Sequence, residues 1–234
     1  MKDLATYVVG KLSEMANPGA PKSEELDLFG IEKLEFLDVP HEKLVGLAED
    51  VGTPKHELAL ELWNCDTYEA KLLSCMFCEP SKITMERADE LAMGLDSWII
   101  CEYCCSKLLW KLPFAARRAL KWANSGDDVL SCVGFSLIAA LAANLPSDSD
   151  NEPGFFDSAL FYARKHASNR NMNVKRAVSY ALCMIGRRSR SWHEGAVETA
   201  EEIAGQPNEA ARWVSSQSLA ELKCTKVTNM FKES

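Results

Sequence analysis

The stretch VKRAVSYALCMIGRRS, residues 174–189, carries the pattern that decides the fold. Its apolar residues recur three and four positions apart, which is the period of a helix that buries one face. The same spacing continues through most of the chain. Alternating polar and apolar runs bounded by Asn-Gly or Asp-Gly turns, which would indicate strands, are missing from the sequence. We therefore predict an all-α protein.

The apolar pattern is interrupted at residues 17–19, 146–150 and 205–208, where Pro, Gly, Asn, Asp and Ser gather. Pro40, Pro54 and Pro113 suit positions in the first turn of a helix, because a first-turn residue has no helical partner for its N–H group. The expected helices span about 2–16, 40–50, 55–64, 67–79, 84–94, 97–110, 113–124, 127–144, 154–168, 172–186, 191–204 and 208–221.

These helices would pair antiparallel, with roughly 30–45 residues to a pair, which is the spacing of HEAT-like arrays. Each pair would bury one face against its neighbours and so build a curved α-solenoid with a concave side. A compact helical bundle without repeats is the alternative architecture. We expect a single domain over residues 1–234, with an N-terminal helical cap at 1–28 and the repeat region at 29–227.

The composition is that of a folded soluble protein, with 234 residues, 47% of them hydrophobic and 26% charged. No apolar run approaches the ~18 residues that would cross a bilayer, and the first residues lack a secretory signal. Nine cysteines, an odd number, fit a reducing compartment. The sequence therefore predicts a cytoplasmic protein without a membrane partner, expected to be a monomer.

Charge is distributed unevenly around a net value of −8. Residues 1–102 hold 9 basic and 21 acidic side chains, whereas residues 158–193 hold no Asp or Glu at all. A purely basic window gathers positive potential, which a polyanion partner requires. An ordinary solvated helix surface is the alternative. The basic residues of this window are Arg164, Lys165, Arg170, Lys175, Arg176, Arg187, Arg188 and Arg190.

Two cysteine pairs offer a different kind of site. Cys75 and Cys78, and then Cys101 and Cys104, repeat a spacing seen in zinc sites. Both pairs lie within helical patterns and not in tight glycine turns, which favours small buried hydrophobic side chains over metal ligands. The four dispersed histidines form no catalytic spacing, and the chain has no glycine-rich phosphate loop or nucleophile elbow.

Three segments together resemble one family. They are LALELWNCDTYEAKLLSCMF (58–77), then LDSWIICEYCC (95–105) with KWANSGDDVLSCVGFSLIAALA (121–142), and then VKRAVSYALCMIGRRS (174–189) with ARWVSSQSLAEL (211–222). In this order they resemble the AlkD-like DNA alkylation-repair family, which are HEAT-like repeat DNA glycosylases. The resemblance runs from about Phe29 to about Val227. It implies release of cationic N3- or N7-alkylated purines from duplex DNA held in a concave basic channel, without metal or cofactor.

The resemblance also implies roles for particular residues. Glu102 would stabilise the positive charge that develops on the deoxyribose and orient the attacking water. Trp98, four residues earlier on the same helix face, and Tyr180 would line the lesion. The residues implied to reach backbone phosphates are Lys175, Arg176, Arg187, Arg188 and Arg190.

Several positions depart from the family pattern. Glu102 stands where the family has Asp, and Tyr180 where it has Trp. The remaining departures are Ile99 for an acidic residue, Ser131 and Cys132 for a basic pair, and Cys183 for an Arg. Because a displacement near 1 Å can cost about a hundredfold in rate, these changes leave an alternative open. The chain would then be a catalytically inactive relative that binds DNA or a protein partner through the same face.

Overall fold

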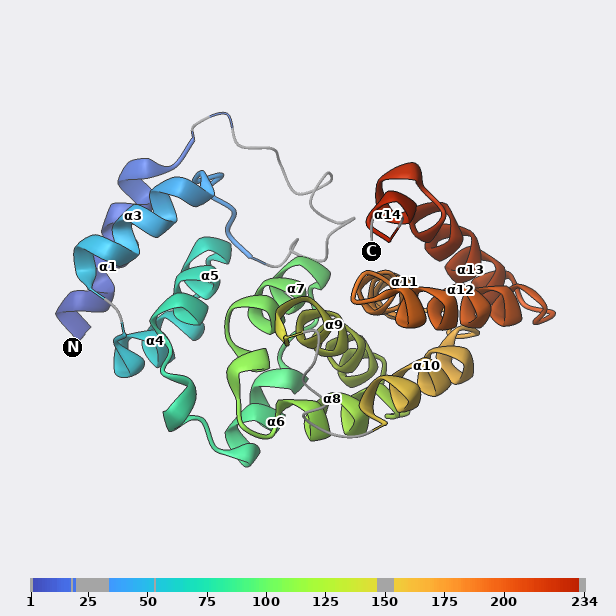
Figure 1. Ribbon diagram of the computed structural model, residues 1–234. Coiled ribbons are helices and arrows are strands. Elements are labelled where there is room, and N and C mark those ends of the chain that lie inside the picture. Colours follow the sequence, from blue (N-terminus) through green and yellow to red (C-terminus); the bar gives the residue numbers. More distant parts are fainter. Residues whose placement is uncertain (1, 18, 20–33, 53, 147–153, 232–234) are drawn as a thin grey trace. The chain divides into compact units, whose positions relative to one another are not determined.

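The computed structural model describes residues 2–17, 19, 34–52, 54–146 and 154–231 (Figure 1). The described residues form α-helices and short 3-10 turns, and their one β-bridge is an isolated contact between Glu35 and Thr67. The chain divides into two compact units, which are described separately. The N-terminal unit comprises residues 1–91 and 95–112, and the C-terminal unit comprises residues 92–94 and 113–234.

The N-terminal unit is a set of short helices that pack in pairs. Its contacts join α4 to α5, α5 to α7, α3 to α5, and α1 to α4. Phe77, Leu73 and Leu62 are completely buried between these helices. Its helices are α1 (Lys2–Met15), α3 (His41–Val51), α4 (His56–Trp63), α5 (Tyr68–Phe77), most of α6 (Met85–Met93) and α7 (Trp98–Lys107), with 3-10 turns at Pro80–Lys82 and Leu109–Lys111.

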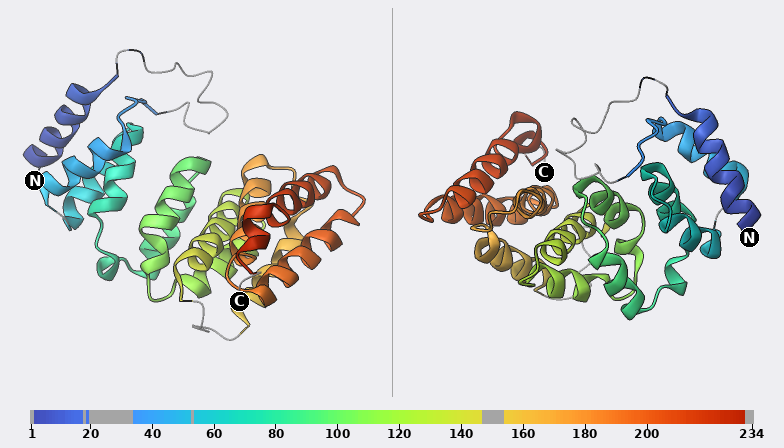
Figure 2. Two further views of the ribbon diagram at one scale, coloured as in Figure 1. Left: turned by 45° about the horizontal axis from the view of Figure 1, so that its top comes forward. Right: turned by 180° about the vertical axis from the view of Figure 1, so that it is seen from behind.

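The C-terminal unit is built around α9. This helix packs on α8 and α11, while α13 packs on both α11 and α12, which lie side by side with it in the orange and red part of Figure 2. Every residue of α9 from 131 to 142 is buried, as expected for a helix that is apolar on all sides. Its helices are α8 (Ala115–Ala123), α9 (Asp128–Asn144), α10 (Phe155–His166), α11 (Met172–Ile185), α12 (Arg190–Ala204), α13 (Glu209–Leu222) and α14 (Thr225–Asn229).

The contact between α8 and α9 depends on one glycine. A Cβ atom added to Gly134 would lie 2.0 Å from the backbone nitrogen of Ala123 and 2.6 Å from its Cα atom. No side chain can occupy that space, because the obstructing atoms belong to the backbone of α8. Gly134 therefore sets how closely the two helices approach.

The predicted helices are all present, with ends that differ by up to three residues. The prolines lie just before helices and not inside them: Pro40 precedes α3 directly, and Pro113 comes two residues before α8. The short helix α14 was not predicted, because five residues are too few to show a period. Much of the predicted N-terminal cap (18 and 20–28) and most of the break at 146–150 lie outside the described residues. In the part that is described, no helix is long and apolar enough to cross a membrane.

Candidate functional site

Helix α7 presents Trp98 and Glu102 one helical turn apart, on the same face. Trp98 is the first residue of α7, and both side chains are half-buried. Burial raises the pKa of the Glu102 carboxyl above its usual range, with Cys101 adding to the rise and Lys107 opposing it. The structure thus places a partly desolvated carboxylate one helical turn from an aromatic residue of the same helix.

Tyr68 is a neighbour of Glu102 that the sequence did not single out. It begins α5, which packs against α7. Burial, together with the charges of Glu69 and Glu102, raises the pKa of the Tyr68 phenol to about 12. The phenol therefore stays protonated at neutral pH and remains a possible hydrogen-bond donor near the Glu102 carboxylate.

Glu69, the residue after Tyr68, is bound to the backbone of another segment of the chain. Its side chain is only 1% exposed. Its carboxylate accepts hydrogen bonds from the backbone nitrogen of Leu37 (3.1 Å to Oε1 and 3.2 Å to Oε2) and from that of Val39 (3.4 Å). Burial raises the pKa of this carboxyl, although the backbone hydrogen bonds pull it the other way. Glu69 holds the segment that leads into α3.

The other predicted site residues lie in the C-terminal unit. Tyr180, Lys175 and Arg176 are half-buried on α11. Asn171 directly precedes this helix and caps it, because its side chain accepts hydrogen bonds from the backbone nitrogens of Asn173 (2.9 Å) and Val174 (3.3 Å). Tyr180 thus belongs to one unit, and the Trp98 and Glu102 pair to the other. Its place in a common site remains a prediction.

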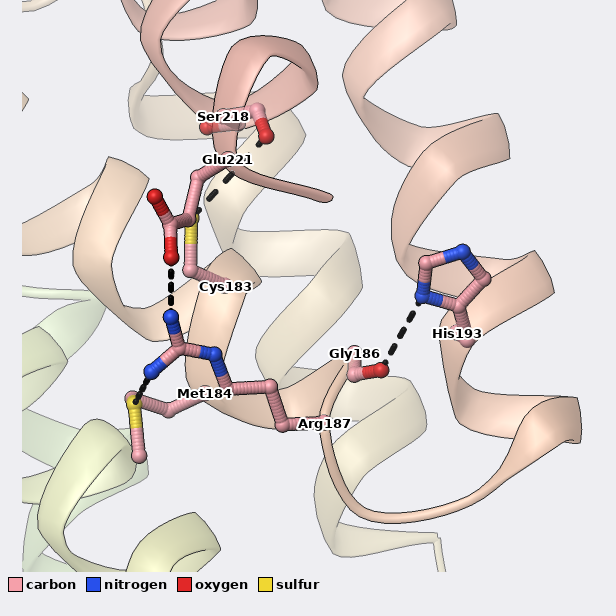
Figure 3. A network of polar contacts seen from close by, with 7 residues as sticks. All are labelled: Cys183, Met184, Gly186, Arg187, His193, Ser218 and Glu221. Atoms are coloured by element: carbon pink, nitrogen blue, oxygen red, sulfur yellow. Dashed lines mark hydrogen bonds and ion pairs between the residues drawn. The ribbon is translucent and has the colours of Figure 1, made fainter. Parts of the chain in front are cut away.

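Arg187 and Arg190 both make polar contacts with other residues of the protein. Arg187 reaches from the end of α11 to an ion pair with Glu221 on α13, and it also contacts the Met184 sulfur at 3.6 Å (Figure 3). The Arg190 guanidinium donates a hydrogen bond to the carbonyl of Phe231. Both arginines link separate segments of the C-terminal unit, and a phosphate would have to compete with these contacts.

Arg188 is held even more firmly. Its guanidinium donates to the carbonyl oxygens of Ala142 (2.8 Å), Leu145 (3.0 Å) and Pro146 (2.8 Å), and it lies 4.6 Å from the ring centroid of Phe156. These carbonyls lie at and just beyond the end of α9, where no helical N–H group is left to bind them. The geometry makes Arg188 a cap for α9. The resemblance had implied a phosphate contact for this residue.

Three of the positions that depart from the family pattern, Ser131, Cys132 and Cys183, are buried. Ser131 and Cys132 are 0% and 3% exposed. Ser131 donates to the Ser125 carbonyl (2.9 Å), and the Cys132 sulfur lies 3.7 Å from the Asn173 carbonyl. Cys183 is also buried, facing the Ser218 carbonyl at 4.0 Å (Figure 3), and burial raises its thiol pKa to about 12. None of these three side chains is placed to contact a large ligand.

Of the cysteine pairs of the N-terminal unit, Cys75 lies on α5 and Cys78 directly follows that helix, whereas Cys101 and Cys104 lie on α7. Burial and a hydrogen bond between the thiols of Cys75 and Cys104 raise the pKa of Cys104, with the hydrogen bond as the larger cause. The Cys78 sulfur lies 3.5 Å from the His56 Nδ1 atom. Among the described residues, no three His, Cys, Asp or Glu side chains come close enough together to hold a metal ion. Of the nine free cysteines, only Cys65 and Cys224 are partly exposed.

A cleft in the C-terminal unit was not predicted from the sequence. It has a volume of about 720 Å³ and lies where α11 and α13 begin. Lys175 reaches into it with its Nζ atom 5.1 Å from the centroid of the Trp213 ring. From the sequence alone, Trp213 would be predicted only to pack between helices. The residues lining this cleft, called the basic cleft below, are Arg170, Lys175, Pro207, Asn208, Glu209, Ala210, Arg212 and Trp213.

The chain is similar to known proteins over most of its length. Residues 9–222 match the family model described as DNA alkylation repair enzyme. An uncharacterized protein of Listeria innocua serovar 6a, Lin0241, is 23% identical over 189 residues, which are 80% of this chain and 76% of that protein.

A solved structure matches with a TM-score of 0.71 at 19% identity, covering 91% of this chain and 92% of its own. It is described as belonging to a new family of proteins related to the HEAT-like repeat DNA glycosylases with affinity for branched DNA structures. This match confirms the predicted all-α, HEAT-like fold. Together with the family model, it supports one conclusion: the chain belongs to the DNA alkylation repair enzyme family.

Proposed function

We propose that this protein binds DNA through the basic cleft of its C-terminal unit. The observation that carries the proposal is the gathering of Arg170, Lys175 and Arg212 around one open cleft. Family membership supports DNA as the polyanion, and the structural relative is described as having affinity for branched DNA. In a chain of net charge −8, the three cations make the cleft a local concentration of positive charge.

Most other basic side chains of residues 158–193 already bind another group of the protein, whereas the arginines of the basic cleft do not. Arg164 pairs with Glu202, and Lys165 donates to the Asn124 side chain at 2.7 Å. Arginines 187, 188 and 190 are held as described above. By contrast, the exposed side chains of Arg170 and Arg212 have no ion-pair or hydrogen-bond partner among the residues that the structure describes. Their guanidinium groups are therefore ready for phosphate oxygens without breaking a contact.

Binding of this kind is sequence-independent and depends on salt, because each neutralised phosphate releases counterions. A suitable test is fluorescence anisotropy with a labelled duplex over a series of salt concentrations. Arg170→Gln and Arg212→Gln should each weaken binding and flatten the plot of log K against log salt by about 0.9 per lost phosphate contact. Arg117→Gln, at an exposed arginine of α8 outside the cleft, is the matched control and should leave both unchanged. Equal effects at all three positions would contradict the proposal.

A second candidate function is base excision, and the α7 pair favours it. The Glu102 carboxylate would stabilise the cationic sugar as a cationic N3- or N7-alkylated purine leaves, and would orient the attacking water. Trp98 would pack against the positively charged nucleotide, and Tyr180 would complete the lining of the lesion. This chemistry requires an ionised Glu102. Because the pKa of that carboxyl is raised, activity should be lost on acidification at a higher pH than for an ordinary glutamate.

Release of free methylated purine from alkylated duplex DNA tests the second candidate directly. The wild type should release base, Glu102→Gln should not, and Glu42→Gln, an exposed carboxylate on α3, should behave as wild type. Equal release by wild type and Glu102→Gln would remove Glu102 from the mechanism. If DNA is bound but no base is released, the protein is a binding member of the family. If DNA is not bound, the remaining hypothesis is that the chain binds a protein partner.

A further inference from the structure

The basic cleft is bordered by two segments that are distant in sequence. Arg170 and Lys175 come from the loop before α11 and from its first turn, whereas residues 207–213 form the loop before α13 and its first turn. The volume of about 720 Å³ falls in the range of roughly 300–1,000 Å³ usual for small-ligand sites. The cleft is therefore large enough for a group the size of a nucleotide, in addition to surface phosphates.

Trp213 distinguishes the cleft from a simple cationic patch. Its neighbours Ala210, Ala211 and Val214 are buried in the helix packing, whereas Trp213 is half-buried and lines the cleft. The Lys175 ammonium, over the ring at 5.1 Å, brings a cation to the aromatic face. An aromatic platform flanked by cations is the arrangement with which proteins bind unpaired nucleotides, since bases stack on the ring while phosphates contact the charges.

Glu209 adds the remaining chemistry of the cleft. A carboxylate repels phosphate but accepts hydrogen bonds from the amino groups on exposed base edges. In a paired duplex the base faces are stacked on one another, so they are not available to Trp213. The combination of cations, indole and carboxylate matches a nucleotide whose base has left the stack.

We propose that the basic cleft binds an unpaired nucleotide of DNA. The base stacks on Trp213 in place of the Lys175 ammonium, which now lies over the ring and turns to a phosphate, and the flanking phosphates are held by Arg170 and Arg212. This inference rests on the proposed DNA binding and specifies its substrate class: DNA that contains unpaired nucleotides, as bulges, flaps and branch points do. Fully paired duplex would contact the arginines alone and bind more weakly.

Two DNAs of equal length, one fully paired and one with a bulge of unpaired nucleotides, provide the test with the full chain. Trp213→Leu should weaken binding of the bulged DNA about tenfold and leave the paired duplex within about twofold. Trp213→Phe should retain most of the affinity for bulged DNA, because it keeps an aromatic face. Arg170→Gln should weaken both DNAs. Melting temperatures of the variants establish that each one is folded.

A second measurement reports stacking itself. The base analogue 2-aminopurine, placed at the unpaired position, fluoresces when unstacked and is quenched when it stacks. Wild type at saturation should lower its emission, and saturating Trp213→Leu should not. This readout holds even where affinity changes little.

The outcomes separate the two proposals. If wild type binds both DNAs equally, or if Trp213→Leu weakens both equally with the 2-aminopurine signal unchanged, the unpaired-nucleotide inference is wrong and DNA binding stands. If wild type binds neither DNA at low salt, the proposed function fails and the inference with it. Selective loss for bulged DNA, together with loss of quenching, supports both.

Discussion

Arg188 donates a hydrogen bond of 2.8 Å to the carbonyl oxygen of Ala142 in the last turn of α9, 46 residues earlier in the chain. Two further carbonyls, of Leu145 and Pro146, share the same guanidinium. Arg188 belongs to the basic segment that the sequence suggested for DNA binding. In the structure, its charge instead binds the end of the buried helix α9. That relationship leads to the first prediction.

Arg188→Gln should lower the free energy of unfolding by about 2–3 kcal/mol, because several carbonyls lose their charged donor. Arg188→Lys should restore only part of this, since an ammonium lacks the planar fork that serves three acceptors. Urea unfolding measures both. Arg117→Gln is the control and should stay within about 0.5 kcal/mol. If the Arg188→Gln protein is as stable as the wild type but binds DNA more weakly, Arg188 contacts a phosphate and does not cap α9.

Gly134→Ala should destabilise the protein by about 3 kcal/mol, since the new methyl group would overlap the backbone of α8. Gly46→Ala on α3 is the matched control. A Cβ there would meet nothing within 4 Å, so the better helix propensity of alanine should raise stability by about 0.5–1 kcal/mol. Thermal and urea unfolding of both variants give the comparison. Opposite signs at the two glycines are expected.

Glu69 should give stability a particular dependence on pH. Its pKa is raised in the folded protein, so in the window between the unfolded and folded pKa values the native state binds more protons than the unfolded state. The contribution of Glu69 is therefore fully present below the unfolded pKa and is lost as pH rises through the folded pKa. Glu69→Gln should remove this contribution to the pH dependence of stability. Melting temperatures measured from acid to neutral pH would test this.

Glu69→Ala tests the other role of the same side chain. It leaves the buried backbone nitrogens of Leu37 and Val39 without an acceptor, at a cost of about 2–4 kcal/mol. Glu69→Gln keeps an acceptor oxygen and should lose much less. Similar losses for the two variants would show that the hydrogen bonds contribute little.

Cys132→Arg would introduce the type of residue that the family resemblance implies at this position. We expect a loss of at least about 3 kcal/mol and no gain in DNA affinity, because the site is buried and would hold an unpaired charge. Cys132→Ala should cost about 1 kcal/mol. An arginine variant that is stable and binds DNA more tightly would show that α9 can open toward a ligand.

The sequence predicted what local periodicity determines. Helices such as α11 and α12 follow from the spacing of their apolar residues, and the Trp98 and Glu102 pair follows from a separation of one helical turn. The sequence could not predict which groups the charged side chains bind, because those partners depend on which segments come together in the fold. From the sequence, Arg188 was predicted to contact a phosphate, whereas in the structure its guanidinium binds carbonyls at the end of α9. The basic cleft stayed hidden for the same reason, since Arg170 and Trp213 lie on different helix pairs.

The distribution of thiol exposure gives the native chain a built-in pair of attachment points. Cys65 belongs to the N-terminal unit and Cys224 to the C-terminal unit, while the other cysteines are buried. Burial raises the pKa of Cys65, so it should react faster with maleimide dyes as the solution is made more alkaline. A donor and an acceptor dye on these two thiols would report the separation of the units by energy transfer, with and without DNA, in the unmutated protein.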